Sequence, residues 1–322
     1  MGIIARVLQD HCFQAHPPVF MDVGASGPPP PLWQEIAKYS ICIAFDADAR
    51  DFVTEGAQGW KKRLAFQCIA TADGQETDFY LTQFPHCSST LAPDLDALGP
   101  WGFRPLFEVV DKVQLPAISL SEALHQAGVS AVDWLKLDTQ GTDLRLFKSL
   151  PEPVQNDLLV VEFEPGILSA YHGEDKLYDV MATMDALPFW VSDMQVKGTQ
   201  RITHKEIDRL SAVQRWDLNT FLTPSPGWCE IGYMTTMPVS TMTRRRCLLA
   251  WVFATCKGQY GFALNIAKLG KIQFDEVLFD DLIAASRRDL NRGYSKFLLS
   301  LTQRVGRKFF TTIKKIAGAL GS

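Results

Sequence analysis

Short apolar runs that end in an acidic residue or a turn recur along the first 200 residues of the chain. They predict buried parallel strands, because such strands are apolar on both faces. Helical patterns separate several of these runs, which is typical of a parallel sheet covered by helices on both faces. The first five predicted strands are Val19–Gly24, Ser40–Ala47, Leu64–Ala70, Val132–Asp138 and Asp157–Pro165. The predicted helices are Leu32–Lys38, Ser119–Ala127, Leu144–Leu150 and Lys176–Leu187.

Two later segments, Phe189–Val196 and Trp228–Thr236, are predicted to complete a sheet of seven strands. The polar stretch between them, residues 197–226, reads as an insertion with a helix around His204–Arg215. Beyond residue 240 the pattern becomes helical. We therefore expect an α/β domain over residues 1–240 and a helical extension over residues 241–322.

Composition narrows the class of protein. The 322 residues are 47% hydrophobic and 21% charged, with a formal net charge of -4, which is typical of a soluble globular protein and argues against nucleic-acid binding. The seven cysteines show no paired short spacing, which favours reduced thiols in a cytoplasmic protein, with no metal site. No stretch resembles a signal peptide, and the longest apolar run, Cys247–Cys256, is too short to span a bilayer.

The C-terminal tail has the opposite charge to the rest of the chain. From Ser286 onward it carries nine Lys or Arg residues against one Asp. Apolar residues recur near helical spacing within Arg304–Gly318. Such a helix suits contact with an anionic membrane or a partner protein, or packing against the domain itself. The oligomeric state stays open.

The first predicted strand ends in a glycine turn, Asp22–Gly27, that four prolines follow. A dinucleotide site would favour a glycine at position 26, where this chain has serine. Asp46 ends the next predicted strand, where a carboxylate can accept hydrogen bonds from both ribose hydroxyls. A nucleoside without a pyrophosphate fits both features, and S-adenosylmethionine is the common cofactor of that kind.

Several motifs together resemble the FkbM family of S-adenosylmethionine-dependent methyltransferases, over roughly residues 15–200. The most specific is Lys136–Gly141, with the pattern Lys-hydrophobic-Asp-x-Gln-Gly. The motifs are Asp22–Gly27, Phe45–Asp48, Ile69–Thr82, Ser88–Leu91, Asp133–Asp143 and Val160–Pro165. The resemblance implies a Rossmann-like class I methyltransferase fold, bound S-adenosylmethionine, and O-methylation of a sugar, glycan or secondary-metabolite hydroxyl. The chain departs from the family in the proline run and at Ser26, Asp46 and Asp143.

The resemblance and the positions of the motifs assign roles to individual residues. Gly24 and Gly27 are expected against the methionine portion of the cofactor, and Asp22 is expected to order that cofactor-binding loop, which also contains Ser26. Asp46 is expected at the ribose, with Ala70 and Asp73 at the adenine. The candidates for the catalytic base are Asp138, His86, His204 and His172, since a hydroxyl acceptor must lose a proton. The role of Asp138 stays open between serving as this base, orienting the acceptor and holding the amino group of the cofactor. One of Glu162 and Glu164 is expected to line the pocket.

Two other functions remain open at this point. One is an oxidoreductase that binds NAD or a nucleotide sugar on a Rossmann-like fold. The other is a binding module without catalytic activity, which uses its C-terminal helices for partner contact. Calorimetry with NADH and S-adenosylmethionine distinguishes an oxidoreductase from a methyltransferase. Turnover of labelled cofactor with a suitable acceptor would exclude a binding module without catalytic activity.

Overall fold

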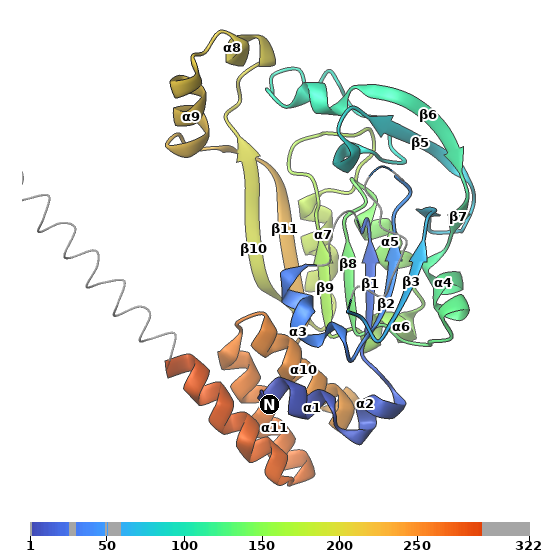
Figure 1. The fold of residues 1–322 in the computed structure, drawn as a ribbon, viewed down its shortest axis with the longest axis vertical. Helices are drawn as coiled ribbons and strands as arrows, with labels where there is room; N and C mark the ends of the chain where they lie inside the picture. The colour runs from blue at the N-terminus through green and yellow to red at the C-terminus, as the bar shows by residue number, and fades with distance from the viewer. Residues whose placement is uncertain (1, 26–29, 49, 51–58, 292–322) are drawn as a thin grey trace, which may run out of the picture. The chain divides into compact units, whose positions relative to one another are not determined.

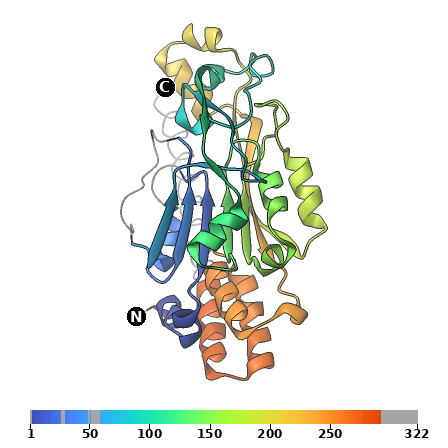
Figure 2. The same cartoon turned by 90° about the vertical axis from the view of Figure 1, so that its right-hand side faces the viewer.

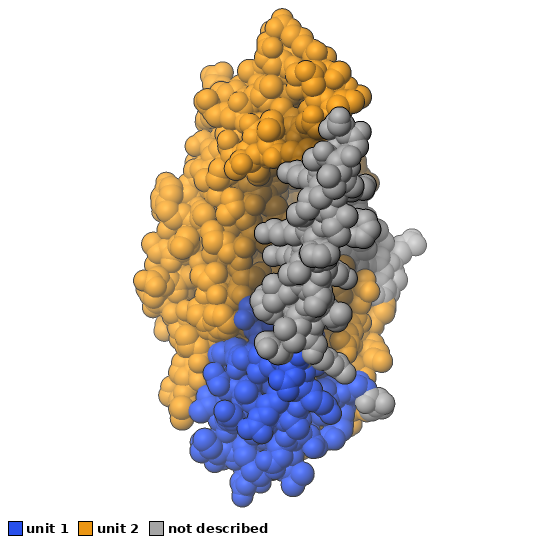
Figure 3. Space-filling view, turned by 90° about the vertical axis from the view of Figure 1, so that its left-hand side faces the viewer, with its two compact units in different colours: residues 1–7, 243–322 blue, residues 8–242 orange. Residues whose placement is uncertain are grey.

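The computed structural model describes residues 2–25, 30–48, 50 and 59–291. The chain divides into two compact units, residues 8–242 and residues 1–7 with 243–322 (Figure 3). The first seven residues therefore belong with the C-terminal part of the chain, which the sequence pattern does not indicate.

The larger unit is built on a sheet of seven strands (Figure 1). Their bounds are β1 (Val19–Val23), β2 (Ile41–Phe45), β3 (Lys62–Phe66), β8 (Trp134–Leu137), β9 (Val160–Phe163), β10 (Phe189–Thr199) and β11 (Ser225–Thr235). Across the sheet the order is β10-β11-β9-β8-β1-β2-β3. The strands β1, β2, β3, β8 and β9 pair in parallel, whereas β11 is antiparallel to both of its neighbours. The predicted α/β fold with a mostly parallel seven-stranded sheet is confirmed.

Alternate residues of β1 are buried on opposite faces of the sheet, as expected of a covered parallel strand. Val19, Met21 and Val23 join a core formed with helices packed on one face. Phe20 lies on the other face, 5.0 Å from the ring of Trp33 and 5.5 Å from that of Trp134. The elements that supply these layers are η1 (Pro31–Trp33), α3 (Gln34–Ala37), α4 (Leu120–Ala127), α5 (Asp143–Ser149), α6 (Glu152–Asp157) and α7 (Leu177–Asp185).

Two local predictions need correction. The third strand does not run to Ala70: it ends at Phe66, and β4 (Ile69–Ala70) pairs instead with β7 (Ala117–Ile118) in a separate two-stranded sheet. The insertion holds two helices, α8 (His204–Asp208) and α9 (Ala212–Thr220). Ser211 separates them, because it forms a capping box with Gln214 and starts a new helix.

A second two-stranded sheet was not predicted from the sequence. β5 (Thr77–Thr82) and β6 (Val109–Leu115) pair in antiparallel fashion and lie beyond the carboxyl ends of the parallel strands (Figures 1 and 2). The segment between them contains the short helical turns η2 (Pro85–Cys87) and η3 (Arg104–Phe107). This arrangement places residues 83–107 over the end of the sheet where ligands of open α/β folds bind.

The smaller unit is helical, as the sequence predicts for the C-terminal extension. It contains α10 (Arg244–Cys256), α11 (Tyr260–Phe274) and a helix described over residues 277–291. The remaining short helices of the chain are α1 (Ile3–Leu8), α2 (His11–Ala15) and η4 (Val239–Thr241). Within residues 2–25, 30–48, 50 and 59–291, no helix has both the length and the apolar content needed to cross a bilayer. The seven cysteines, all within the described residues, are not joined in disulfides.

Candidate functional site

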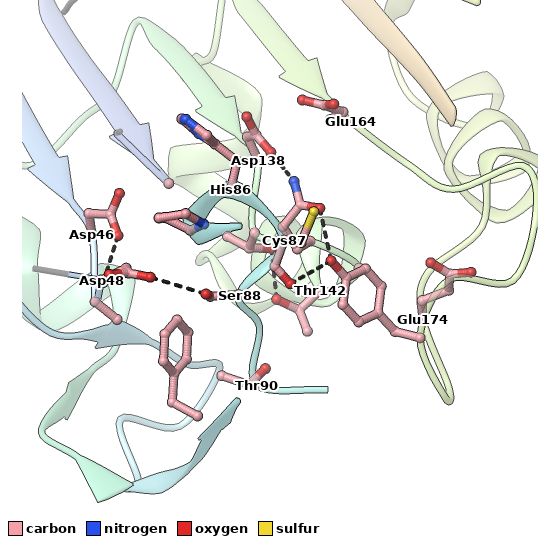
Figure 4. A pocket seen from close by; sticks show the side chains of 18 of the residues that line it. Asp46, Asp48, His86, Cys87, Ser88, Thr90, Asp138, Thr142, Glu164 and Glu174 are labelled. Carbon is pink, nitrogen blue, oxygen red and sulfur yellow. Dashed lines mark hydrogen bonds between the residues drawn. The ribbon is translucent and has the colours of Figure 1, made fainter. Parts of the chain in front are cut away.

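A cavity of about 390 Å³ lies where the central parallel strands end (Figure 4). Its floor comes from residues at the carboxyl ends of the central strands: Val23 and Gly24 at the end of β1, Asp46–Asp48 after β2, Asp138–Thr142 after β8 and Glu164 after β9. Residues of β5 and of segment 83–107 line it as well. The fold therefore brings together residues that are far apart in the chain.

Gly24 is held in the left-handed region, with φ +86. Its N–H donates to the carbonyl of Phe45 at 3.0 Å. A Cβ at this position would lie 1.9 Å from the main-chain oxygen of Asp138, which is far inside contact distance. The sequence predicts that a glycine is needed here because a ligand would approach the main chain closely. In the structure, the main chain at the end of β8 already approaches this position too closely for a side chain. Gly24 also lines the cavity.

Asp46 lines the cavity directly after β2, as the ribose assignment requires. Its Oδ1 accepts the main-chain N–H of Asp48 at 2.8 Å. Burial raises the pKa of Asp46 to about 6; the hydrogen bond from Asp48 opposes the shift, and the charges of Asp48, Asp138 and Asp22 add to it.

Asp48 differs from Asp46 because its charge is compensated. The Nε of Arg50 donates to its Oδ1 at 2.8 Å, and the hydroxyl of Ser88 donates to its Oδ2 at 3.0 Å. Burial raises the pKa of Asp48, but the bonds from Arg50 and Ser88 outweigh burial, so the net shift is downward.

Asp22 is buried and acts behind the cavity, not on its surface. The Nζ of Lys136 lies 3.4 Å from its Oδ1 and 3.5 Å from the Oδ2 of Asp138. Burial lowers the pKa of Lys136, but the surrounding carboxylates raise it by more, so the ammonium stays charged. Lys136 therefore ties the end of β1 to the end of β8.

Asp138 and Glu164 form a carboxyl pair at the ends of β8 and β9. Burial raises the pKa of Glu164, and the charge of Asp138 and a hydrogen bond with it raise it further. The pair therefore keeps a proton at a pH where an isolated glutamate has lost it. Buried Asp143 joins the two loops, because its carboxylate accepts the N–H of Thr139 and that of Glu164, both at 2.8 Å. Of the two glutamates singled out in the sequence, Glu164 is the one that lines the cavity.

Gln140 connects this pair to the opposite side of the cavity. Its Nε2 donates to Oδ1 of Asp138 at 2.8 Å, and its Oε1 lies 3.1 Å from the hydroxyl of Tyr171. That hydroxyl also lies 2.8 Å from the carbonyl of Cys87. Gln140 has φ 57, an unfavourable value for a residue other than glycine that costs on the order of 1 kcal/mol or more. Such strain next to a cavity is typical of a functional site.

The other predicted site residues divide into two groups. His86 and Ala70 line the cavity. His204 does not: it lies exposed on α8, with Nδ1 3.1 Å from the carbonyl of Gly102 and Nε2 3.4 Å from the carboxylate of Asp208. Asp73 lines a separate depression and accepts the N–H of Gln75 at 3.0 Å. Ser26 and Gly27 lie outside the described residues.

The sequence did not single out the apolar part of the cavity. Phe84, Phe103, Leu106, Phe107, Leu168 and Trp228 line it. The density of aromatic residues between positions 84 and 107 is a signal in the sequence, but no period assigns them to a common face. Tyr171 and Glu174 were also missed as lining residues.

The chemistry available at the cavity is that of carboxylates, one histidine, hydroxyls and aromatic rings. Within the described part of the chain, no three His, Cys, Asp or Glu side chains converge in a way that could hold a metal ion. No family model matches the chain, and neither a curated protein nor a solved structure does.

Proposed function

We propose that the protein is an S-adenosylmethionine-dependent methyltransferase of the FkbM type that methylates a hydroxyl group. The order of the strands supports this most. Numbered along the chain within the large sheet, the strands lie in the order third, second, first, fourth, fifth, seventh, sixth, with the seventh antiparallel to its neighbours. Class I methyltransferases have this order and this single reversed strand.

The motifs behind the family resemblance provide independent support. Each of the six contributes at least one lining residue to the same cavity, although they are spread over residues 22–165. Gly24 and Asp46 lie beside the point where the strand order reverses, between β1 and β8, which is where open α/β sheets bind ligands.

The residues present fit the cofactor. Asp46 would hold the ribose hydroxyls, the chain around Gly24 would lie along the methionine portion, and the apolar residues Ile69 and Ala70 would border the adenine. When bound, S-adenosylmethionine supplies a sulfonium methyl, which the acceptor oxygen takes while its proton passes to the protein and S-adenosylhomocysteine remains. Carboxylates in the cavity wall suit a cation of this kind.

The protein's own part in the reaction would be to orient the acceptor and to accept its proton. The Asp138–Glu164 pair is placed for proton transfer, because it lines the cavity and one of its members is basic for a carboxylate. His86 is the second candidate on the cavity surface. Holding the acceptor in line with the methyl group can contribute on the order of 7–11 kcal/mol to lowering the barrier.

Titration calorimetry on the whole protein tests the proposal. S-adenosylmethionine should bind and NADH should not, and Asp46→Asn should weaken cofactor binding about 10- to 100-fold through lost charge-assisted hydrogen bonds. The exposed Asp96 provides the matched control, Asp96→Asn, which should bind as the parent protein does. Binding of NADH with no binding of S-adenosylmethionine would overturn the proposal in favour of an oxidoreductase.

A further inference from the structure

The cavity has an apolar wall, which we define as Phe84, Phe103, Leu106, Phe107, Leu168 and Trp228. Phe103 is its centre: its ring lies 6.0 Å from that of Phe107 and 6.3 Å from that of Trp228, both in tilted or edge-on geometry. Phe84 and Leu106 remain 42% and 40% exposed. The wall therefore offers apolar surface that the fold itself does not bury.

The charges at the cavity have one sign. Five carboxyl groups line it, those of Asp46, Asp48, Asp138, Glu164 and Glu174, of which the Asp138–Glu164 pair keeps a proton, and no Lys or Arg is among the described lining residues. An anion entering this cavity would therefore meet like charges.

Basic residues compensate some of these carboxylates. Arg50 pairs with Asp48, and Lys136 lies 3.5 Å from Asp138. The Nζ of Lys176 lies 2.6 Å from the carboxylate of Glu174. Each of these three cations is paired with a carboxylate that lines the cavity, and none of the three is among the described lining residues.

We propose that the acceptor is an uncharged hydroxyl compound with a large apolar surface, and that phosphorylated sugars and nucleotide sugars are excluded. The inference rests on the proposed methyltransferase function, because the carboxylates at the strand ends are assigned there to cofactor and base. Burial of apolar acceptor surface against the wall favours binding in proportion to the area covered. An anionic acceptor would lose its hydration without gaining a cationic partner.

A neutral fluorescent probe tests the wall directly. N-phenyl-1-naphthylamine, which emits strongly only in apolar surroundings, should bind the full-length protein with and without saturating S-adenosylmethionine. Octyl glucoside below its micelle concentration should displace it. Glucose 1-phosphate should not. If glucose 1-phosphate displaced the probe at least as effectively as octyl glucoside does, the proposal would be overturned.

Two matched substitutions locate the bound probe. Phe84→Ser removes a partly exposed ring of the wall and should weaken probe binding about fivefold to tenfold. Phe221→Ser removes a ring that is 68% exposed but does not line the cavity, and it should leave binding unchanged. Equal effects of the two substitutions would place the probe elsewhere on the surface and contradict the proposal.

The same measurements separate this inference from the methyltransferase assignment. Binding of S-adenosylmethionine without binding of the probe would contradict the proposal of an apolar acceptor but would still support the assignment of the cofactor. Binding of the probe without binding of S-adenosylmethionine would contradict the methyltransferase assignment, and the apolar wall would then have no role in binding an acceptor. Competition between probe and cofactor would mean that the wall belongs to the cofactor site, which also overturns the inference.

Discussion

The main-chain oxygen of Asp138 lies 1.9 Å from the position that a Cβ on Gly24 would occupy. This contact joins the ends of β1 and β8 at the point where the strand order reverses. The side chain of the same Asp138 faces the cavity and pairs with Glu164. The geometry of the carboxyl pair therefore depends on the absence of a side chain at the end of the neighbouring strand, 114 residues earlier in the chain.

Gly24→Ala should destabilise the protein by more than about 2 kcal/mol, because the new methyl group must displace β8 and also suffers from the positive φ. The matched control is Gly128→Ala. Gly128 also has a positive φ, +71, but an added Cβ there would have nothing within 4 Å. It should lose only about 1 kcal/mol, the cost of the backbone conformation. Urea denaturation measures both. Equal losses in the free energy of unfolding for the two variants would show that the steric overlap with Asp138 does not destabilise the protein.

Cofactor affinity should depend on pH through Asp46, whose pKa is raised to about 6. Only the ionised carboxylate is a strong acceptor for the ribose hydroxyls, so the affinity for S-adenosylmethionine should be constant above pH 7. It should fall by up to about tenfold per pH unit below pH 6. Calorimetry across this range measures the profile. Asp46→Asn should flatten it, and an unchanged slope in this variant would assign the titration to another group.

The same carboxylate should cost stability at neutral pH. Because the pKa of Asp46 in the folded protein, about 6, lies above its ordinary value of 3.8, folding favours the protonated form. Its contribution to stability is therefore fully present below about pH 4 and is lost as the pH rises through 6. Asp46→Asn should raise the free energy of unfolding at pH 7.5 by about 1–2 kcal/mol after solvent screening. Thermal unfolding at pH 4 and 7.5 tests this, and an equal gain at both values would contradict it.

Asp138→Asn should lower kcat by about 10²- to 10⁴-fold if the carboxyl pair accepts the acceptor proton. The variant should still fold, because Lys136 keeps Asp22 as a partner at 3.4 Å. Loss of the Asp138 charge also removes a cause of the raised pKa of Glu164, so the acidic limb of the pH–rate profile should move to lower pH. A folded variant with full turnover and an unchanged profile would remove Asp138 from the mechanism.

The two candidate histidines should differ in their effect on turnover. His86→Gln should lower kcat, by about tenfold or more if this histidine contacts the acceptor, because it lines the cavity. His204→Gln should change kcat less than about twofold, since His204 lies exposed on α8 against Gly102 and Asp208. Steady-state turnover of both variants measures this. The opposite ranking would show that the insertion reaches the site during the reaction.

The sequence predicts the large sheet well because each of its central strands is an apolar run of its own. The hairpin of β5 and β6 escapes prediction because most of β6 is exposed and has no apolar alternation. Its pairing partner lies almost thirty residues earlier in the chain, and local periodicity carries no information on such contacts. The split of the third strand has the same cause, since β4 is defined only by its pairing with β7.

The residues of the site also divide into those that a local sequence pattern predicts and those that depend on contacts between distant parts of the chain. Gly24, Asp46 and Asp138 can be placed from the sequence, because the carboxyl end of a parallel strand is a fixed position relative to its neighbours. Gln140 and Tyr171 act through hydrogen bonds between separate loops. The apolar wall combines four residues of segment 83–107 with Leu168 and with Trp228 of β11. Neither feature follows from a pattern along the chain.

Residues 1–7 form a compact unit with residues 243–322, although the whole of the other unit lies between them in the chain. During translation the N-terminal segment therefore leaves the ribosome well before the helices it folds with. At about 5–20 residues per second the interval is roughly 10–50 s, long enough for a domain of this kind to fold first. The nascent chain must carry Ile4 and Val7, which are buried at the end of folding, without their final partners for that time.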